Sequence, residues 1–227
     1  MSIFILKFCI FLCKGIFQQP PNKIIGGFVV PEDSVQFKFT VLVISKQNKT
    51  RSSGCGGSLI SPNYVLTAAH CVEKSESVKV IQFEPLIKKN TTYEVSDVLL
   101  HPKFERTQVF NLYDFAILKL KVPVKKTNFF ICLPSNKLGQ LVGKNLTISG
   151  WGLTSLNMND NSDVFKSGFV TAMLNSDCSK IYEKLYNKEL QEENPGSPHA
   201  PVFVPQTIIC VDGHITKSTP CMGDSGG

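Results

Sequence analysis

The stretch Phe37–Ile44, FKFTVLVI, is a run of β-branched and aromatic residues, whose side chains favour β-strands. Similar short runs recur along the chain, with turn-forming residues between them. They are Ser58–Ile60, Tyr64–Thr67, Val78–Phe83, Phe115–Leu120 and Leu146–Ser149. Because many short strands with frequent turns are typical of all-β proteins, the pattern predicts a β-barrel or a β-sandwich.

One segment, Ser176–Glu192, has the periodicity of a helix instead. Its apolar residues at helical spacing are Ile181, Tyr182, Leu185 and Tyr186. We expect a surface helix with this stripe facing the body of the protein and with Ser176 or Asp177 as its N-cap. The four prolines of Asn194–Pro205 exclude regular secondary structure there, so we expect an exposed loop.

The length, composition and charge of the chain are typical of a folded globular protein. A chain of 227 residues that is 42% hydrophobic can bury a sizeable core in one or two domains. The formal net charge is +6, and the lysines are scattered along the chain. No basic segment interleaved with aromatic residues suggests nucleic-acid binding, so we expect a solvated surface and no nucleic-acid partner.

The amino-terminal stretch Ile3–Cys13, IFILKFCIFLC, is apolar except for Lys7. It is too short to span a bilayer but suits the core of a secretory signal, with cleavage after Gly15. We therefore predict a signal peptide over residues 1–15 and a secreted, extracellular protein without a membrane anchor. The alternative is that this stretch forms a buried first strand.

The cysteines and glycosylation sequons agree with secretion. The cysteines after the leader are Cys55, Cys71, Cys132, Cys178, Cys210 and Cys221. In an oxidising compartment these thiols could pair. Sequons begin at Asn48, Asn90 and Asn145, which are the predicted glycosylation sites. No CxxC or HExxH spacing indicates a metal site, so none is expected.

Three short motifs carry residues suited to nucleophilic catalysis. They are LTAAHC with His70, NLYDFAILKL with Asp114 and GDSGG with Ser225. Alone, His70 could be a buried structural histidine, Asp114 a turn residue before a strand, and Ser225 part of a flexible tail. Their joint occurrence, each in a distinctive surround, favours a catalytic site.

The motifs taken together resemble the chymotrypsin/trypsin family of secreted serine peptidases. The other motifs, in the family's order, are IIGG at 24–27, SGCGGSLIS at 53–61 and ISGWG at 148–152. The resemblance runs from Lys23 to Gly227 and implies a peptidase domain over residues 24–227. It further implies two Greek-key antiparallel β-barrels, the second incomplete at its C-terminus, and no cofactor.

The resemblance also implies catalytic roles. Ser225 would attack a peptide carbonyl, while His70 accepts its proton and Asp114 orients the imidazole. The backbone N–H groups of Gly223 and Ser225 would form the oxyanion hole.

Activation by proteolysis is a second implication. Residues 16–23 would be a propeptide, and cleavage between Lys23 and Ile24 would free an α-ammonium group that pairs with Asp224. The uncut chain would then be an inactive zymogen that requires a trypsin-like activating protease. The alternative is that the Lys23–Ile24 bond lies in an ordinary exposed loop.

Substrate selectivity in this family depends on the residue six positions before the nucleophile, which here is Thr219. Because Thr219 offers no charge to Arg or Lys, we expect cleavage after apolar residues, with Met222 adding apolar surface at the pocket. Protein and peptide substrates, and protease inhibitors, are the remaining expected partners of a monomer.

Two disulfides follow from the resemblance. They are Cys55–Cys71 and Cys178–Cys210. The partner of Cys221 would lie beyond Gly227, and Cys132 would be free or paired with Cys13. Leu146 stands where many members carry a further cysteine, so we expect that bridge to be absent.

The family's sequences continue well past the position of Gly227. We therefore expect this sequence to be an incomplete piece of a full peptidase. The alternative is a catalytically inactive homologue that acts as a secreted binding or regulatory module.

Overall fold

The computed structural model describes residue 24 and residues 27–31, 34–84, 89–107, 109–125, 129–133, 141–152, 164–214, 218–220 and 224–227. The predicted signal peptide and propeptide lie outside the described residues. So do Lys23 and the positions Cys221, Met222 and Gly223.

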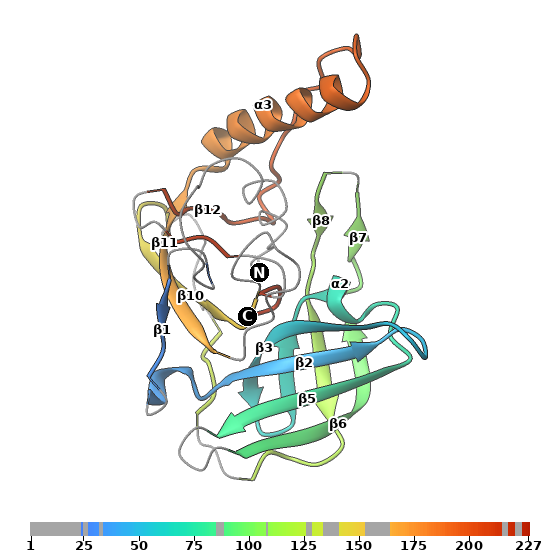
Figure 1. Ribbon diagram of the computed structural model, residues 1–227, viewed down its shortest axis with the longest axis vertical. Coiled ribbons are helices and arrows are strands. Elements are labelled where there is room, and N and C mark those ends of the chain that lie inside the picture. The colour runs from blue at the N-terminus through green and yellow to red at the C-terminus, as the bar shows by residue number, and fades with distance from the viewer. Residues whose placement is uncertain are drawn as a thin grey trace.

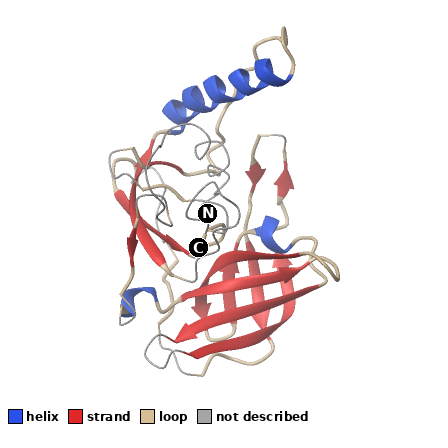
Figure 2. Ribbon diagram, in the orientation of Figure 1, coloured by secondary structure: helices blue, strands red, loops and turns tan. Residues whose placement is uncertain are grey.

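The described chain forms a closed β-barrel and a smaller open sheet beside it, with a long helix at the far end of the open sheet (Figures 1 and 2). The strands of the barrel are β2 (Thr40–Lys46), β3 (Ser52–Ser61), β4 (Tyr64–Thr67), β5 (Ser77–Glu84), β6 (Lys89–Leu100) and β9 (Ala116–Leu120). They pair antiparallel in the order β2-β3-β4-β9-β6-β5, and β5 closes the barrel on β2. The all-β prediction is confirmed.

Alternating burial explains why these strands close around a core. In β2 and β9 every second side chain points inward, as expected when one face of a sheet is buried. The fully buried apolar side chains of the barrel include Val41, Val43, Leu59, Val65, Val80 and Leu118. All six predicted strand runs overlap strands, and four of them lie within strands over their whole length. The first run is wrong at its start, because Val35–Phe37 forms a 3-10 helix and β2 begins at Thr40.

The open sheet contains four antiparallel strands. They are β1 (Phe28–Val29), β10 (Asn145–Gly150), β11 (Lys166–Met173) and β12 (Cys210–Asp212). β11 lies between β10 on one edge and β1 and β12 on the other. Within the described part of the chain this sheet does not close into a barrel.

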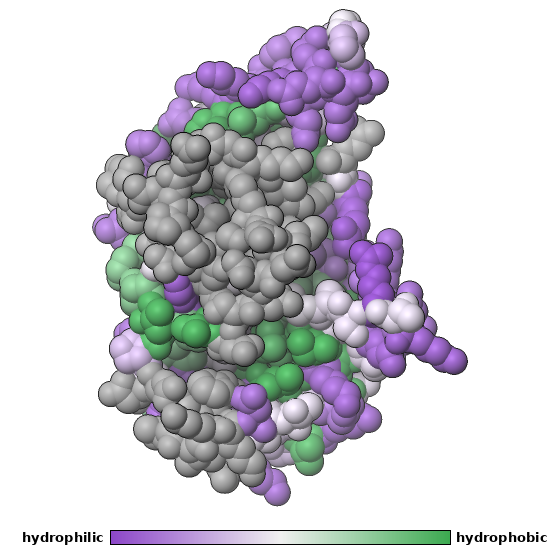
Figure 3. Space-filling view, in the orientation of Figure 1, coloured by the Kyte–Doolittle hydropathy of each residue, from purple (hydrophilic) through white to green (hydrophobic). Residues whose placement is uncertain are grey.

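The predicted surface helix is α3, Asn175–Glu193, which extends one residue beyond the prediction at each end. Its polar surface is visible in Figure 3. The N-cap prediction is wrong: Leu174 occupies that position, no side chain caps the helix, and Ser176 and Asp177 lie in the first turn.

The predicted apolar stripe of α3 is partly wrong. Tyr182 and Tyr186 pack inward with Cys178, at a spacing of four residues, but Ile181 is 40% exposed. None of the helices in the described residues is long and apolar enough to cross a membrane.

The segment Asn194–Pro205 is irregular, as its prolines predict, but it is not wholly exposed. Val202 and Val204 are buried in a small core beneath α3. The buried side chain of Asn187 donates to the Ala200 carbonyl at 2.8 Å and accepts from the Ala200 N–H at 2.7 Å. Each such bond contributes about 1 kcal/mol, so Asn187 fastens the segment to the helix.

Two short elements complete the part of the fold that carries the site. Helix α2, Ala69–Val72, follows β4 directly. The strands β7 (Glu105–Arg106) and β8 (Asn111–Leu112) form a hairpin between β6 and β9.

Candidate active site

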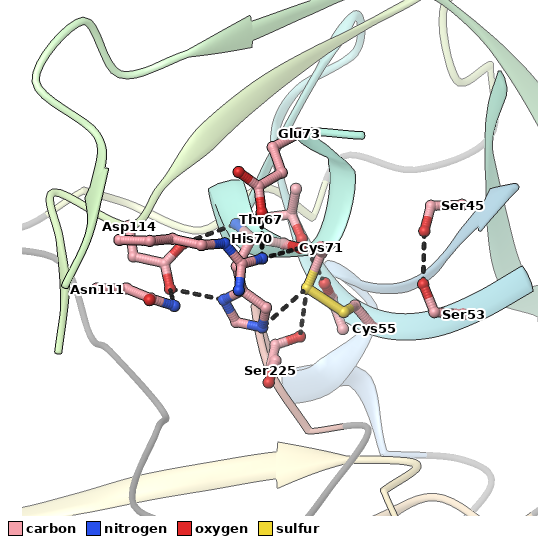
Figure 4. The surroundings of a disulfide bond; sticks show 12 residues. Ser45, Ser53, Cys55, Thr67, His70, Cys71, Glu73, Asn111, Asp114 and Ser225 are labelled. Carbon is pink, nitrogen blue, oxygen red and sulfur yellow. Dashed lines mark hydrogen bonds and ion pairs between the residues drawn. A yellow bond between two sulfur atoms is a disulfide. The ribbon is translucent and has the colours of Figure 1, made fainter. Parts of the chain in front are cut away.

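His70 lies in α2 at one end of the barrel. Its neighbours Ala69, Cys71 and Val72 are buried and anchor the helix in the core, whereas the imidazole side chain is 21% exposed. The disulfide between Cys55 and Cys71 joins β3 to this helix. His70 is therefore held beside solvent on a short, doubly anchored element (Figure 4).

Asp114 faces His70 from the segment between β8 and β9, and its side chain is fully buried. One carboxylate oxygen, Oδ2, lies 2.6 Å from His70 Nδ1, and Oδ1 accepts the backbone N–H of His70 at 2.8 Å. Because an ionised carboxylate only accepts hydrogen bonds, Nδ1 carries the proton in the neutral imidazole. That tautomer leaves Nε2 with a free lone pair, which is the arrangement that a general base requires.

The charge of Asp114 is maintained by its hydrogen bonds. Burial is the largest single influence on this carboxyl and raises its pKa, whereas the side-chain hydrogen bond from His70, the electrostatic attraction of that side chain and the His70 backbone N–H each lower it. Asn111 adds a fourth lowering effect, because its Nδ2 donates to Oδ2 at 3.0 Å. The net pKa of Asp114 therefore lies below its ordinary value.

An unusual backbone conformation precedes the carboxylate. Tyr113 has φ of 50°, in the left-handed region that non-glycine residues rarely adopt. The ring of His101 stacks on the Tyr113 ring at 4.9 Å between centroids, nearly parallel to it. This contact supports the turn from which Asp114 points inward.

Ser225 lies at the boundary between the barrel and the open sheet. Its carbonyl accepts the Gly56 N–H of β3 at 2.7 Å. Gly226 follows with φ of 85°, and a side chain there would collide with Thr67 and the Gly56 carbonyl. Figure 4 shows Ser225 beside the Nε2 edge of the His70 ring, on the side away from Asp114.

Asp224, the residue before this serine, is buried, and so is Ile24. Asp224 Oδ1 accepts the Gly152 N–H at 2.7 Å, and a side chain at Gly150 or Gly152 would collide with the carboxylate. Ile24 is fully buried, against Gly27 and Gly168. Both residues line an apolar cavity of about 460 Å³ between the two parts of the fold.

The remaining predicted positions that the structure describes are the pocket residue Thr219 and the three sequon asparagines. Thr219 is half-buried. The sequon residues Asn48, Asn90 and Asn145 are all exposed.

Both predicted disulfides, Cys55–Cys71 and Cys178–Cys210, are present. Cys132 is exposed and forms no disulfide with any cysteine that the structure describes. In the described residues the one group with metal-ligand geometry is Cys55, His70 and Cys71, but both sulfurs are engaged in a disulfide.

Asn111 is the residue of this site that sequence reasoning missed. Its only signal is its place three positions before Asp114, which does not reveal that its amide reaches the carboxylate.

A family model for Trypsin matches residues 24–227, so the chain belongs to the trypsin family of serine peptidases. The identity to brachyurin of Leptuca pugilator is 34%, over 76% of this chain and 69% of that protein. Phenoloxidase-activating factor 3 of Holotrichia diomphalia is 30% identical over 92% of this chain, which spans 60% of that protein. Chymotrypsin of Phaedon cochleariae is 27% identical, over 94% of this chain and 74% of that protein.

A solved structure described as "Structure of GrC" has the same fold, with a TM-score of 0.59, 22% identity and coverage of 72% of each chain. The family assignment makes the chain a serine endopeptidase by class, and the all-β trypsin fold agrees with the barrel and sheet described above.

The lowered pKa of Asp114 predicts an acid-sensitive contribution to stability. Since the folded state binds the proton less tightly than the unfolded state, this contribution is complete above the unfolded pKa of about 3.9 and is lost as pH falls through the lower folded pKa. Replacing the carboxyl, Asp114→Asn, removes this titration. We expect the free energy of unfolding of the variant, measured by urea denaturation, to fall less steeply than that of the parent from about pH 5 downward.

Asp97→Asn, at an exposed position, serves as the control for removal of one acidic group from the surface. Equal slopes for Asp114→Asn and the parent would contradict the assignment of a buried, ionised carboxylate.

Proposed function

We propose that this chain is a serine endopeptidase in which Ser225, His70 and Asp114 hydrolyse peptide bonds through an acyl-enzyme. The observation that carries the proposal is the buried Asp114 carboxylate bonded to His70 Nδ1, with the opposite edge of the ring beside Ser225 (Figure 4).

The chemistry follows from that arrangement. His70 Nε2 takes the proton of the Ser225 hydroxyl as Oγ attacks the peptide carbonyl, and it returns the proton to the departing amine. Water then attacks the acyl-enzyme by the same proton transfers and releases the carboxylic acid product. Asp114 remains ionised and stabilises the imidazolium in both steps. The N–H groups of Ser225 and Gly223 bind the oxyanion, Gly223 lying outside the described residues.

We propose that the protein is secreted after removal of residues 1–15 and glycosylated at Asn48, Asn90 and Asn145. The exposure of all three asparagines and the presence of two disulfides support an extracellular location. Protease inhibitors, in addition to substrates, are its expected partners, and we expect a monomer.

Cleavage of the Lys23–Ile24 bond is proposed as the activating step. The new Ile24 ammonium would pair with Asp224, whose carboxylate would then order the adjacent oxyanion hole. The burial of Ile24 and Asp224 along one cavity supports this pairing, because a buried carboxylate requires compensating partners.

An apolar residue is the proposed preference on the amino side of the cleaved bond. Thr219, at the pocket position, has no charge to bind Arg or Lys, and Met222 would add apolar surface. Such an enzyme would not cut after its own Lys23, so a separate trypsin-like protease would activate it.

A fluorophosphonate probe tests the catalytic proposal. After cleavage of Lys23–Ile24 by immobilised trypsin, which is removed before the probe is added, we expect covalent labelling of Ser225, located by mass spectrometry. The Ser225→Ala and His70→Ala variants should remain unlabelled because they lack the nucleophile and its base. Absence of labelling in the cleaved parent would contradict the proposal and favour a non-catalytic binding module.

Competing peptides test the substrate preference. In a mixture that differs only in the residue before the cleaved bond, we expect kcat/KM for Phe or Leu to exceed that for Arg by at least about tenfold, since an unpaired cation would be desolvated in an uncharged pocket. The Thr219→Asp variant should shift the ratio towards Arg. A parent that prefers Arg would overturn the preference.

A further inference from the structure

The β7–β8 hairpin rises from the barrel beside α2 and points towards the region under α3 (Figure 1). Its strands place Arg106 directly opposite Asn111. Thr107 closes the turn, because its hydroxyl oxygen accepts the Phe110 N–H at 2.8 Å and its hydroxyl lies 2.6 Å from the Phe110 carbonyl.

The tip of the hairpin is anchored in the other part of the fold. Phe110 is 7% exposed and belongs to the small core that contains Val202, Val204 and the Cys178–Cys210 disulfide. Its ring meets the Tyr182 ring of α3 edge to face, with 5.1 Å between centroids. The hairpin therefore connects the barrel to α3.

The residue after this anchor reaches the active site. Asn111 is 1% exposed, and its Nδ2 donates to Asp114 Oδ2 at 3.0 Å. The carboxylate can only accept, so the amide nitrogen must face it. The amide oxygen, Oδ1, is buried and has no hydrogen-bond partner among the described residues. Since an unpaired buried oxygen destabilises a fold, this side chain is poorly explained by stability alone.

The opposite strand of the hairpin holds the histidine. Arg106 Nη2 donates to the His70 carbonyl at 3.3 Å. The same guanidinium forms an ion pair with Glu73, the C-cap residue that follows α2. Neighbouring positions of one hairpin thus contact both His70 and Asp114.

We propose that Asn111 is a positioning residue for the His70–Asp114 pair, acting from a hairpin that Phe110 fixes to the α3 core. Oδ2 receives two donors, the His70 Nδ1–H and the Asn111 amide, so rotation of the carboxylate would break both bonds together. Asn111 in this way keeps Oδ2 directed at Nδ1. The catalytic consequence of this role rests on the proposed function; the structural consequence does not.

The Nδ1 proton of His70 reports on this bond directly. Its exchange with water is measured by NMR on ¹⁵N-histidine-labelled protein, whose four histidines allow assignment. Asn111→Leu keeps the number and branching of the side-chain heavy atoms and removes both the amide donor and the unpaired oxygen. In this variant we expect exchange to become faster than in the parent by about tenfold, the ratio that corresponds to loss of a hydrogen bond to a charged group. In the unfolding midpoint, loss of the donor to the buried carboxylate and removal of the unpaired oxygen have opposite effects, so Nδ1 exchange is the readout of the positioning role.

The matched control is Glu105→Gln, an exposed position on the same hairpin, whose Nδ1 exchange should equal the parent's. Exchange in Asn111→Leu within about threefold of the parent's would overturn the proposal. If leucine prevents folding, Asn111→Ala gives the same readout without a clash. Failure of both variants to fold would also overturn it, by assigning Asn111 a structural role.

Kinetics supply the second readout. In the cleaved protein, Asn111→Leu should lower kcat by about tenfold and change KM by less than about twofold, because the side chain does not touch substrate. A rise in KM at unchanged kcat would contradict the role. The exchange measurement needs no catalysis. If the cleaved parent were not labelled by the fluorophosphonate probe, the proposed function would be wrong, whereas the positioning role of Asn111 would still be tested by Nδ1 exchange.

Discussion

A fully buried carboxylate, Asp114, is the constraint on which the site depends. An ion removed from water must be surrounded by donors, and here His70 and Asn111 provide them. That requirement fixes the distance between α2 and the β8–β9 segment. The hydrogen bonds of the buried carboxylate also compensate for the strained left-handed conformation of Tyr113, the residue before Asp114.

The serine side of the site depends on close backbone approach instead. Gly226 lets the chain pass against Thr67, and the Gly56 N–H fixes the carbonyl of Ser225 to the barrel. The backbone of Ser225 is therefore held against the barrel that carries His70, although Ser225 is far from His70 in the sequence. Asp224, one residue earlier, turns towards Gly152 and the open sheet.

Much of this could be predicted from the sequence, and the reasons for the rest are physical. Strand runs such as Tyr64–Thr67 were identifiable because alternation and β-branching are local properties. The contact between Asn111 and Asp114 is tertiary: the register of a short hairpin decides it, and composition does not encode it. Likewise, Val202 is buried in the core beneath α3, where the hydrogen bond from Asn187 to Ala200 holds the proline-rich segment against the helix. No local sequence pattern in that segment indicates this tertiary contact.

We propose that the chain carries one assembled nucleophile, Ser225 with His70 and Asp114. The most direct measurement is a burst titration of the chain cleaved before Ile24, using a nitrophenyl ester with an apolar acyl group. We predict rapid release of about one equivalent of nitrophenol per folded chain, followed by slower turnover, because acylation of Ser225 would precede hydrolysis. A linear release without a burst, equal in rate to that of the Ser225→Ala protein, would contradict it.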